Sequence, residues 1–265
     1  MTVPSPLELA IVAFRWVEYL GLLGFIGVLV IRRLAANQPP MQWARLPMHR
    51  ALALALVGGL GTVVTQAVFT GGGGGGDAQS FVRMGRVVAE GLALGFCLAG
   101  VRFVVPPALL AAVLLAFAGH GARVQPPAIG IIVDALHILS AGMWGGGIIA
   151  MALSRPPGGW GAGEGRALLG RFSRVAPLAF AMTALTGLLR ATQELSAVSD
   201  LWTTSYGVVL SLKGAGVVAM LVLSLLAWRR GLPVARWEAL VAAVVMAASA
   251  LLAAYPATPG MGLAP

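Results

Sequence analysis

Ionisable residues interrupt several otherwise apolar stretches of this chain at similar distances from one end of each stretch. They are Arg15, Glu18, Glu90, Asp134, His137 and Lys213. A charged side chain near the centre of a bilayer costs at least about 2.5 kcal/mol, so such residues usually face the interior of a helix bundle and mark a path for a substrate or ion. The pattern therefore predicts one polar site inside a membrane protein.

The composition agrees with this class of protein. The 265 residues are 58% hydrophobic and 10% charged, with a mean hydropathy of +0.89, which leaves too few polar side chains to cover a water-soluble globule. We predict an all-α polytopic transmembrane bundle of about eight helices that forms a single domain over residues 1–265. The expected spans are 7–34, 47–70, 82–103, 105–119, 126–153, 168–193, 202–228 and 235–255.

The arginines predict the orientation of this bundle, because short cytoplasmic loops carry an excess of Lys and Arg. Four arginines lie on the side with the two termini, namely Arg83, Arg86, Arg123 and Arg190, and twelve lie on the other side. Both termini are therefore expected to face outward. The net charge of +9 does not indicate nucleic acid as a partner, since the arginines flank spans and do not form one basic face.

With this orientation the six ionisable residues lie roughly 10–16 Å below the outer surface, at about 1.5 Å per helical residue. Arg15 and Glu18 are three residues apart and would form an ion pair on one helix face. Lys213 would pair with Glu90 or Asp134. The sequence leaves two interpretations open, a functional polar pocket and a set of ion pairs that only hold the bundle together.

Two histidines suggest a metal site. His120 follows a span of only about 14 residues, too short for the bilayer, so it should lie sunken beneath the outer surface. His137 lies near the same level on the next helix, with Asp134 one turn away as a ligand or as the group that orients an imidazole. The alternative is that each histidine is a hydrogen-bonded packing residue.

A single cysteine is the other soft ligand of interest. Cys97 lies two turns inward of Glu90 on the same helix face, so it is a candidate relay point for a soft cation, or else a small packing residue. The sequence has no nucleotide-binding fingerprint and no Ser/His/Asp arrangement. We therefore expect no enzymatic activity.

Ordered motifs between residues 119 and 230 resemble those of the bacterial copper resistance protein D family. Gly119-His120-Gly121 is followed by the pattern D-x-x-H-x-x-x-A-x-x-W-x-G-G over residues 134–147. The later blocks are Arg171-Phe172-Ser173, Thr186-Gly187, and Thr204-Ser205-Tyr206-Gly207 followed by Leu210 and Lys213. Each block is weak alone, but their order is specific.

The resemblance implies a multi-pass protein of the bacterial inner membrane with periplasmic termini. It would take copper from the periplasm toward the cytoplasm, receiving it from a periplasmic copper-binding protein. Carried onto this sequence, the best candidates would be His120, Asp134, His137 and Trp144, with Tyr206 and Lys213 supporting them. Together with the argument from the residues, this gives His120, His137 and Asp134 as expected metal ligands, and it adds Arg15, Glu18 and Glu90 to the supporting pocket. Imidazole suits both Cu(I) and Cu(II) whereas carboxylate favours Cu(II), so the oxidation state stays open.

Two functions from other classes also fit the sequence. A b-type haem or quinone redox protein would place His120 and His137 on opposite sides of one iron. A membrane assembly factor for copper enzymes would bind its partners without transporting the metal.

Overall fold

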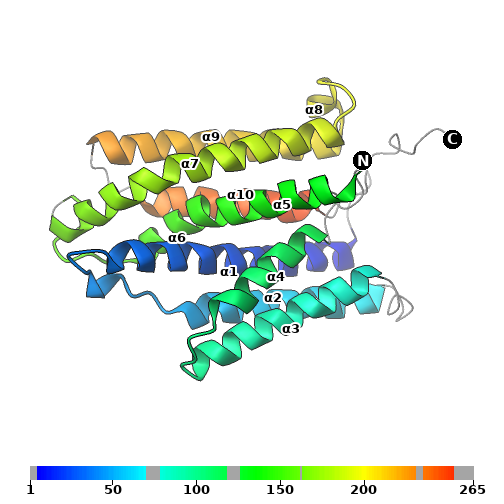
Figure 1. Ribbon diagram of the computed structural model, residues 1–265. Coiled ribbons are helices and arrows are strands. Elements are labelled where there is room, and N and C mark those ends of the chain that lie inside the picture. The colour runs from blue at the N-terminus through cyan, green and yellow to red at the C-terminus, as the bar shows by residue number, and fades with distance from the viewer. Residues whose placement is uncertain (1–4, 70–77, 118–125, 162, 231–234, 254–265) are drawn as a thin grey trace.

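The computed structural model describes residues 5–69, 78–117, 126–161, 163–230 and 235–253 (Figure 1). These residues form helices and no strand. The helices are α1 (Pro6–Ala36), η1 (Gln42–Ala44), α2 (Met48–Phe69), α3 (Ala78–Leu98), α4 (Val105–Phe117), α5 (Pro127–Ala141), η3 (Gly142–Gly146), α6 (Gly147–Leu153), α7 (Gly163–Glu194), α8 (Asp200–Thr203), α9 (Ser205–Arg230) and α10 (Ala235–Leu252).

Six helical segments within the described residues are long and apolar enough to cross a membrane, which confirms the all-α polytopic prediction. They are α1, α2, the continuous α5–η3–α6 segment, α7, α9 and α10. The span expected at 82–103 corresponds to α3, which carries Arg83, Arg86 and Glu90. The span expected at 105–119 corresponds to α4, which has only 13 residues. The total of eight spans therefore stays a prediction.

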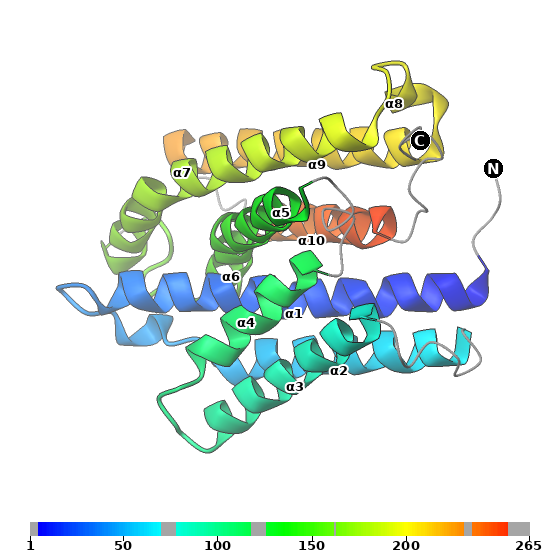
Figure 2. The ribbon, with the colours of Figure 1, turned by 45° about the vertical axis from the view of Figure 1, so that its right-hand side comes forward.

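Successive long segments run in opposite directions through the bundle (Figures 1 and 2). One end holds the last turn of α1 and the starts of α2, α4, α7 and α10, and we call it the arginine-rich end because Arg32, Arg33, Arg45 and Arg50 lie there. The other end holds the starts of α1, α3, α5 and α9, and we call it the N-terminal end. This alternation matches the predicted order of the spans.

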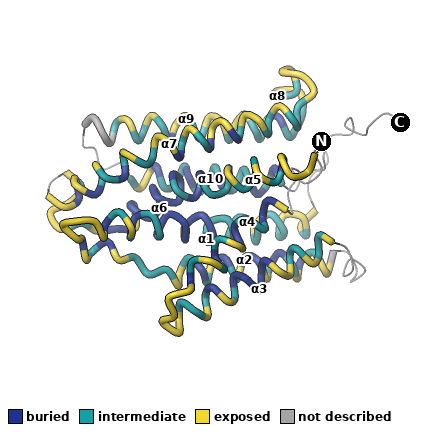
Figure 3. Tube along the Cα trace, viewed as in Figure 1, coloured by how far each residue is buried: buried dark blue, intermediate teal, exposed yellow. Residues whose placement is uncertain are grey.

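Helix α1 is the centre of the bundle, and α2, α4, η3, α6 and α10 all pack against it. The tube in Figure 3 is buried in the middle of α1, where Gly21 to Val28 form a continuous buried stretch. Two glycines allow this packing. A Cβ on Gly21 would overlap the backbone of Ala55, and a Cβ on Gly27 would overlap the backbone of Gly146. Small residues at these contacts let helix backbones approach each other closely in a membrane.

The segment after α5 changes from an α-helix to a π-helical turn, η3. This turn packs against α1 and α7: Gly146 lies against the Leu23 carbonyl, and the neighbouring Gly147 lies against the Phe172 ring. Single π-turns inside helices occur frequently at functional sites. The contacts on both sides fix the position of Trp144, which belongs to this turn.

The outer helices expose apolar side chains, as a lipid-facing surface requires. Examples are Val64 on α2, Leu185 on α7, Leu212 on α9 and Val244 on α10, each more than half exposed. Helix α9 is the most peripheral of the spans and packs mainly against α10 and α8. Its loose packing leaves room for a cavity beside it.

We expect Gly27→Ala to destabilise the protein by about 1–3 kcal/mol, because its Cβ would overlap backbone atoms that cannot rotate away. Thermal unfolding of the purified protein in detergent measures this change. Gly24→Ala is the matched control on the same helix, since nothing lies within 4 Å of a Cβ there. Equal unfolding temperatures for the two variants would contradict this account of the α1–η3 contact.

Candidate functional site

His137 on α5 is held by two hydrogen-bond partners from α7. Its Nδ1 lies 3.1 Å from the Thr183 carbonyl oxygen and 3.0 Å from the Thr186 hydroxyl oxygen. The Thr186 hydroxyl donates to the Met182 carbonyl, so its oxygen accepts from the ring. Because a carbonyl only accepts, the geometry assigns the imidazole proton to Nδ1. The lone pair of the neutral ring is then on Nε2, which is the atom that would bind a metal.

Helix α7 is shaped to receive this ring. A Cβ on Gly187 would lie 3.3 Å from His137 Cε1, so the glycine leaves space for the imidazole. The hydroxyls of Thr183 and Ser140 lie 2.9 Å apart and link the same two helices one turn further along. The Thr186-Gly187 motif therefore supplies both an acceptor for the histidine and the room that it occupies.

Asp134 lies one turn before His137 on α5 and forms an ion pair with Arg190 of α7, with Oδ1 and Nε 3.0 Å apart. The Asp134 side chain is 2% exposed and that of Arg190 is 30% exposed. Arg190 and Lys213 both act electrostatically on His137, and Asp134 acts on Lys213 and Tyr206. We use the name α5–α7 cluster for Asp134 and His137 of α5, Arg190 of α7, and the neighbouring Tyr206 and Lys213 of α9.

A second group of charges lies between α1 and α3. Arg86 Nε is 2.5 Å from Glu18 Oε1, and the carboxyl of Glu90 contacts that of Glu18. We call these three residues the α1–α3 cluster. The members of the predicted pocket thus form two ion-paired groups in the structure, and a single pocket shared by all of them stays a prediction.

The predicted ion pair between Arg15 and Glu18 is wrong, because each of the two residues has another partner. Arg15 Nη1 donates instead to the Ala253 carbonyl, 2.8 Å away after the end of α10. Glu18 takes Arg86 as its cation. A residue three positions away on the same helix competes poorly with a cation that a neighbouring helix places directly against the carboxylate.

Two arginines that the sequence interpretation assigned to the outer side of the membrane are the counter-charges of these clusters. Arg86 is 3% exposed within α3, and Arg190 lies within α7. A signal for both was present in the sequence. A carboxylate inside a bundle requires a nearby cation, and Arg86 and Arg190 lie within or beside expected spans at the depth of Glu90 and Asp134.

Trp144 lies two turns past His137, toward the arginine-rich end. Its ring packs edge-on against Phe180 of α7, with ring centroids 4.9 Å apart. Both rings line a largely apolar cavity of about 340 Å³, together with residues that include Met151, Ser224 and Glu238. Ser224 donates a hydrogen bond to Glu238. Trp144 therefore belongs both to the helical segment that carries His137 and to the wall of this cavity.

The structure does not support a functional role for the two other predicted site residues, His120 and Cys97. His120 lies outside the described residues. Cys97 is partly buried and packs against the apolar cluster around Phe25 and Leu52, which gives no support to a relay role. In the part of the chain that the structure describes, no three His, Cys, Asp or Glu side chains come together as a preformed metal site.

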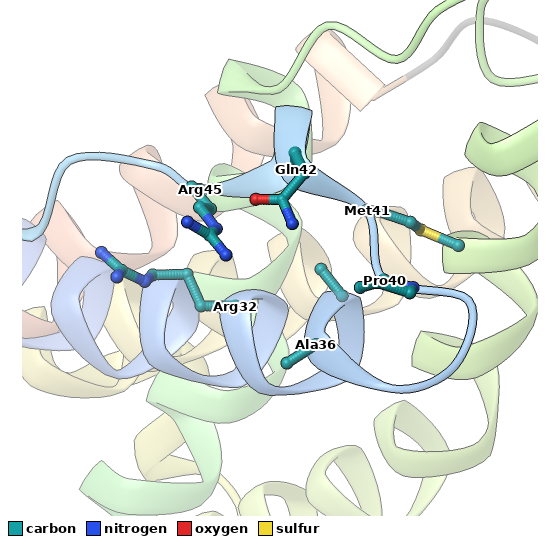
Figure 4. Close-up of a pocket in the computed structure, with 7 residues that line it drawn as sticks. Arg32, Ala36, Pro40, Met41, Gln42 and Arg45 are labelled. Atoms are coloured by element: carbon teal, nitrogen blue, oxygen red, sulfur yellow. The ribbon is translucent and has the colours of Figure 1, made fainter.

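A smaller pocket of about 210 Å³ opens at the arginine-rich end, where Arg32, Gln42 and Arg45 line it (Figure 4). It lies beside the turn that follows α1. Arg171 of α7 donates hydrogen bonds to four carbonyls of this turn, those of Leu34, Asn37, Gln38 and Pro39. The Arg171-Phe172-Ser173 motif therefore connects α7 to the end of α1.

The fold and the site together define a multi-pass α-helical membrane protein with two buried charge clusters and an oriented intramembrane histidine. The copper resistance protein D family matches residues 166–255. The chain is also 37% identical over 113 residues to the copper transport protein CutJ of Bacillus subtilis (strain 168). That match covers 41% of this chain but only 20% of CutJ. No solved structure matches the chain.

These comparisons confirm the predicted resemblance to the copper resistance protein D family and associate the chain with copper-related membrane proteins. The family match covers α7, α9 and α10. It includes Thr183, Thr186, Arg190 and Lys213, which contact or surround His137, whereas Asp134 and His137 themselves lie before it.

We expect Arg190→Met to destabilise the protein by about 1–3 kcal/mol, because it removes a cation from a buried carboxylate. The expected loss is below that of a fully enclosed pair, since Arg190 is 30% exposed and partly screened by its surroundings. Chemical unfolding in detergent measures it.

The double variant Asp134→Asn/Arg190→Met should recover most of this loss, because it removes both charges together. Arg174→Met is the control on the same helix, since Arg174 is exposed. Strictly additive losses in the double variant would show that the two charges do not stabilise each other.

Proposed function

We propose that this protein binds copper as its cargo at His137 and moves it across a bacterial inner membrane, from the periplasm toward the cytoplasm. The orientation of the His137 ring carries this proposal. Thr183 and Thr186 hold Nδ1, so Nε2 is presented as a ligand atom. The similarity to a copper transport protein supports copper as the metal.

Further ligands would come from residues near the same level. His120 is the candidate second imidazole, on the sequence argument alone. Asp134 would serve as a ligand only by exchanging Arg190 for the metal, and otherwise balances the charge beside it. Imidazole accepts both Cu(I) and Cu(II), so this set of ligands suits either oxidation state.

The proposed direction follows from the arginines and from the depth of His137. The positive-inside tendency places the arginine-rich end in the cytoplasm. His137 then lies in the periplasmic half of the segment Pro127–Leu153. A periplasmic copper-binding protein would deliver the metal at the N-terminal end.

The route inward would pass the rings of Trp144 and Phe180 and enter the cavity beyond them. The thioether of Met151 and the carboxyl of Glu238 are potential ligands for copper in this cavity. The ring pair would close the route in the described conformation. Its opening would therefore be a step of transport.

We expect His137→Ala to abolish high-affinity copper binding, and Thr186→Val to weaken binding by about 10–100-fold, because it removes an acceptor that orients the ring. Titration of the purified protein with copper against a competing chelator measures both. The matched controls are His49→Ala and Thr192→Val, exposed residues away from the cluster. Wild-type affinity in His137→Ala would refute the proposed site.

The same preparations test the two other functions. A visible Soret band that disappears in His137→Ala would replace copper with haem at this residue. Normal copper binding without copper movement into proteoliposomes would favour an assembly factor.

We expect Phe180→Ala to increase the rate of copper entry into proteoliposomes several-fold, because it removes one ring of the closing pair. Copper affinity should stay close to that of the wild type, since the groups that orient His137 Nδ1 are Thr183 and Thr186 and remain in place. Leu178→Ala is the control, as Leu178 is 69% exposed on the same helix. An unchanged or slower rate would show that the rings do not close the route.

A further inference from the structure

The α1–α3 cluster encloses two carboxyl groups with one guanidinium. Glu18 and Glu90 are 0% exposed and Arg86 is 3% exposed. Glu18 forms the ion pair with Arg86, and its carboxyl also contacts that of Glu90. Two ionised carboxylates would leave this apolar interior with one uncompensated negative charge, which a low-dielectric environment strongly disfavours.

Helix α2 packs against both α1 and α3 (Figure 2), and no charged side chain of α2 pairs with the cluster. A Cβ on Gly58 would overlap the backbone of Glu18, and a Cβ on Gly59 would overlap Glu90 Oε2. The nearest hydroxyl of this helix, that of Thr62, is itself buried and donates to the Gly58 carbonyl. Helix α2 therefore faces Glu18 and Glu90 with two glycines and with no charged side chain.

The remaining charged group near the cluster is Arg15 of α1, which is engaged by the Ala253 carbonyl. Apart from the ion pair with Arg86, no described residue donates a hydrogen bond to the carboxylate oxygens of Glu18 or Glu90. A proton on one carboxyl would supply the absent donor and remove the excess charge in one step. Paired carboxyls in other proteins share a proton for the same reason.

We propose that Glu18 and Glu90 form a proton-binding site that holds one exchangeable proton beside Arg86, and that this proton is exchanged during copper transport. Only the coupling to copper rests on the proposed function. Polar side chains lead from the cluster to the N-terminal end: Arg83, one turn before Arg86, donates to Gln66 and Ser80. This ladder gives a proton a path toward the periplasmic side.

Infrared spectroscopy of the purified, copper-free protein tests the site directly. The wild type should show a carbonyl stretch from a protonated carboxyl that shifts in D₂O and disappears as the pH rises. Glu90→Gln should remove this band, and Glu238→Gln, which changes a buried carboxyl elsewhere, should leave it in place. A wild-type spectrum without such a band, or a band that survives both Glu18→Gln and Glu90→Gln, would overturn the proposal.

Charge counting gives a second test that does not depend on copper. Glu18→Gln and Glu90→Gln should each yield folded, monodisperse protein, because one carboxylate still faces Arg86. The double variant Glu18→Gln/Glu90→Gln should lose most of its folded protein, and adding Arg86→Met should restore it. Single variants that are clearly more stable than the wild type would show that both carboxylates are ionised and that the site holds no proton, against the proposal.

Proteoliposomes with an internal pH dye test the coupling. Copper entry should be accompanied by proton movement, and Glu90→Gln should abolish that movement. If His137→Ala binds copper normally while the infrared band titrates, the copper site is refuted and the proton site stands. Copper entry without any proton movement would refute the coupling alone.

Discussion

A carboxylate enclosed by apolar helices requires a cation or a proton beside it, and the arrangement of this bundle meets that requirement twice. Glu18 on α1 forms an ion pair with Arg86 on α3, and Asp134 on α5 forms one with Arg190 on α7. The first pair connects α1 to α3, which are not consecutive in the chain, and the second connects the α5–η3–α6 segment to α7, the span that follows it. The charges that make insertion into a membrane costly therefore also select which helices become neighbours.

Close contact between helix backbones makes these pairings possible. Gly21 and Gly27 let α2 and η3 approach α1, and Gly58 and Gly59 let α2 cover the carboxyls of the α1–α3 cluster without a side chain in between. On the other side of the bundle, Gly187 gives the His137 ring its place against α7. The glycines thus position the polar groups, although they have no chemistry of their own.

The two clusters suggest a division of roles within the proposed function. The α5–α7 cluster has an oriented imidazole, and Trp144 and Phe180 near it line a cavity, which suits the proposed passage of a metal ion. The α1–α3 cluster is fully buried, and its charge balance suits a proton. The copper resistance protein D match covers the α7 and α9 residues around His137, while the proposed ligands His137 and Asp134 lie before it on α5.

Much of the architecture follows from the sequence alone. The apolar lengths predict α1, α2, α7 and α10 to within a few residues at most ends, and helical spacing correctly places Asp134 and His137 one turn apart. The spacing does not reveal that 202–228 begins with a separate short helix, α8, because four residues are too few for a periodic pattern.

The sequence by itself determined how far along its own helix each charged residue lies, because that position depends only on the rise of the helix per residue. Only the tertiary structure decided which charges meet, since that depends on the rotation of each helix and on which helices are neighbours. Five of the six residues expected at one level therefore belong to two clusters, and Arg86 and Arg190, counted from the sequence as outer charges, are the cations that pair with their carboxylates.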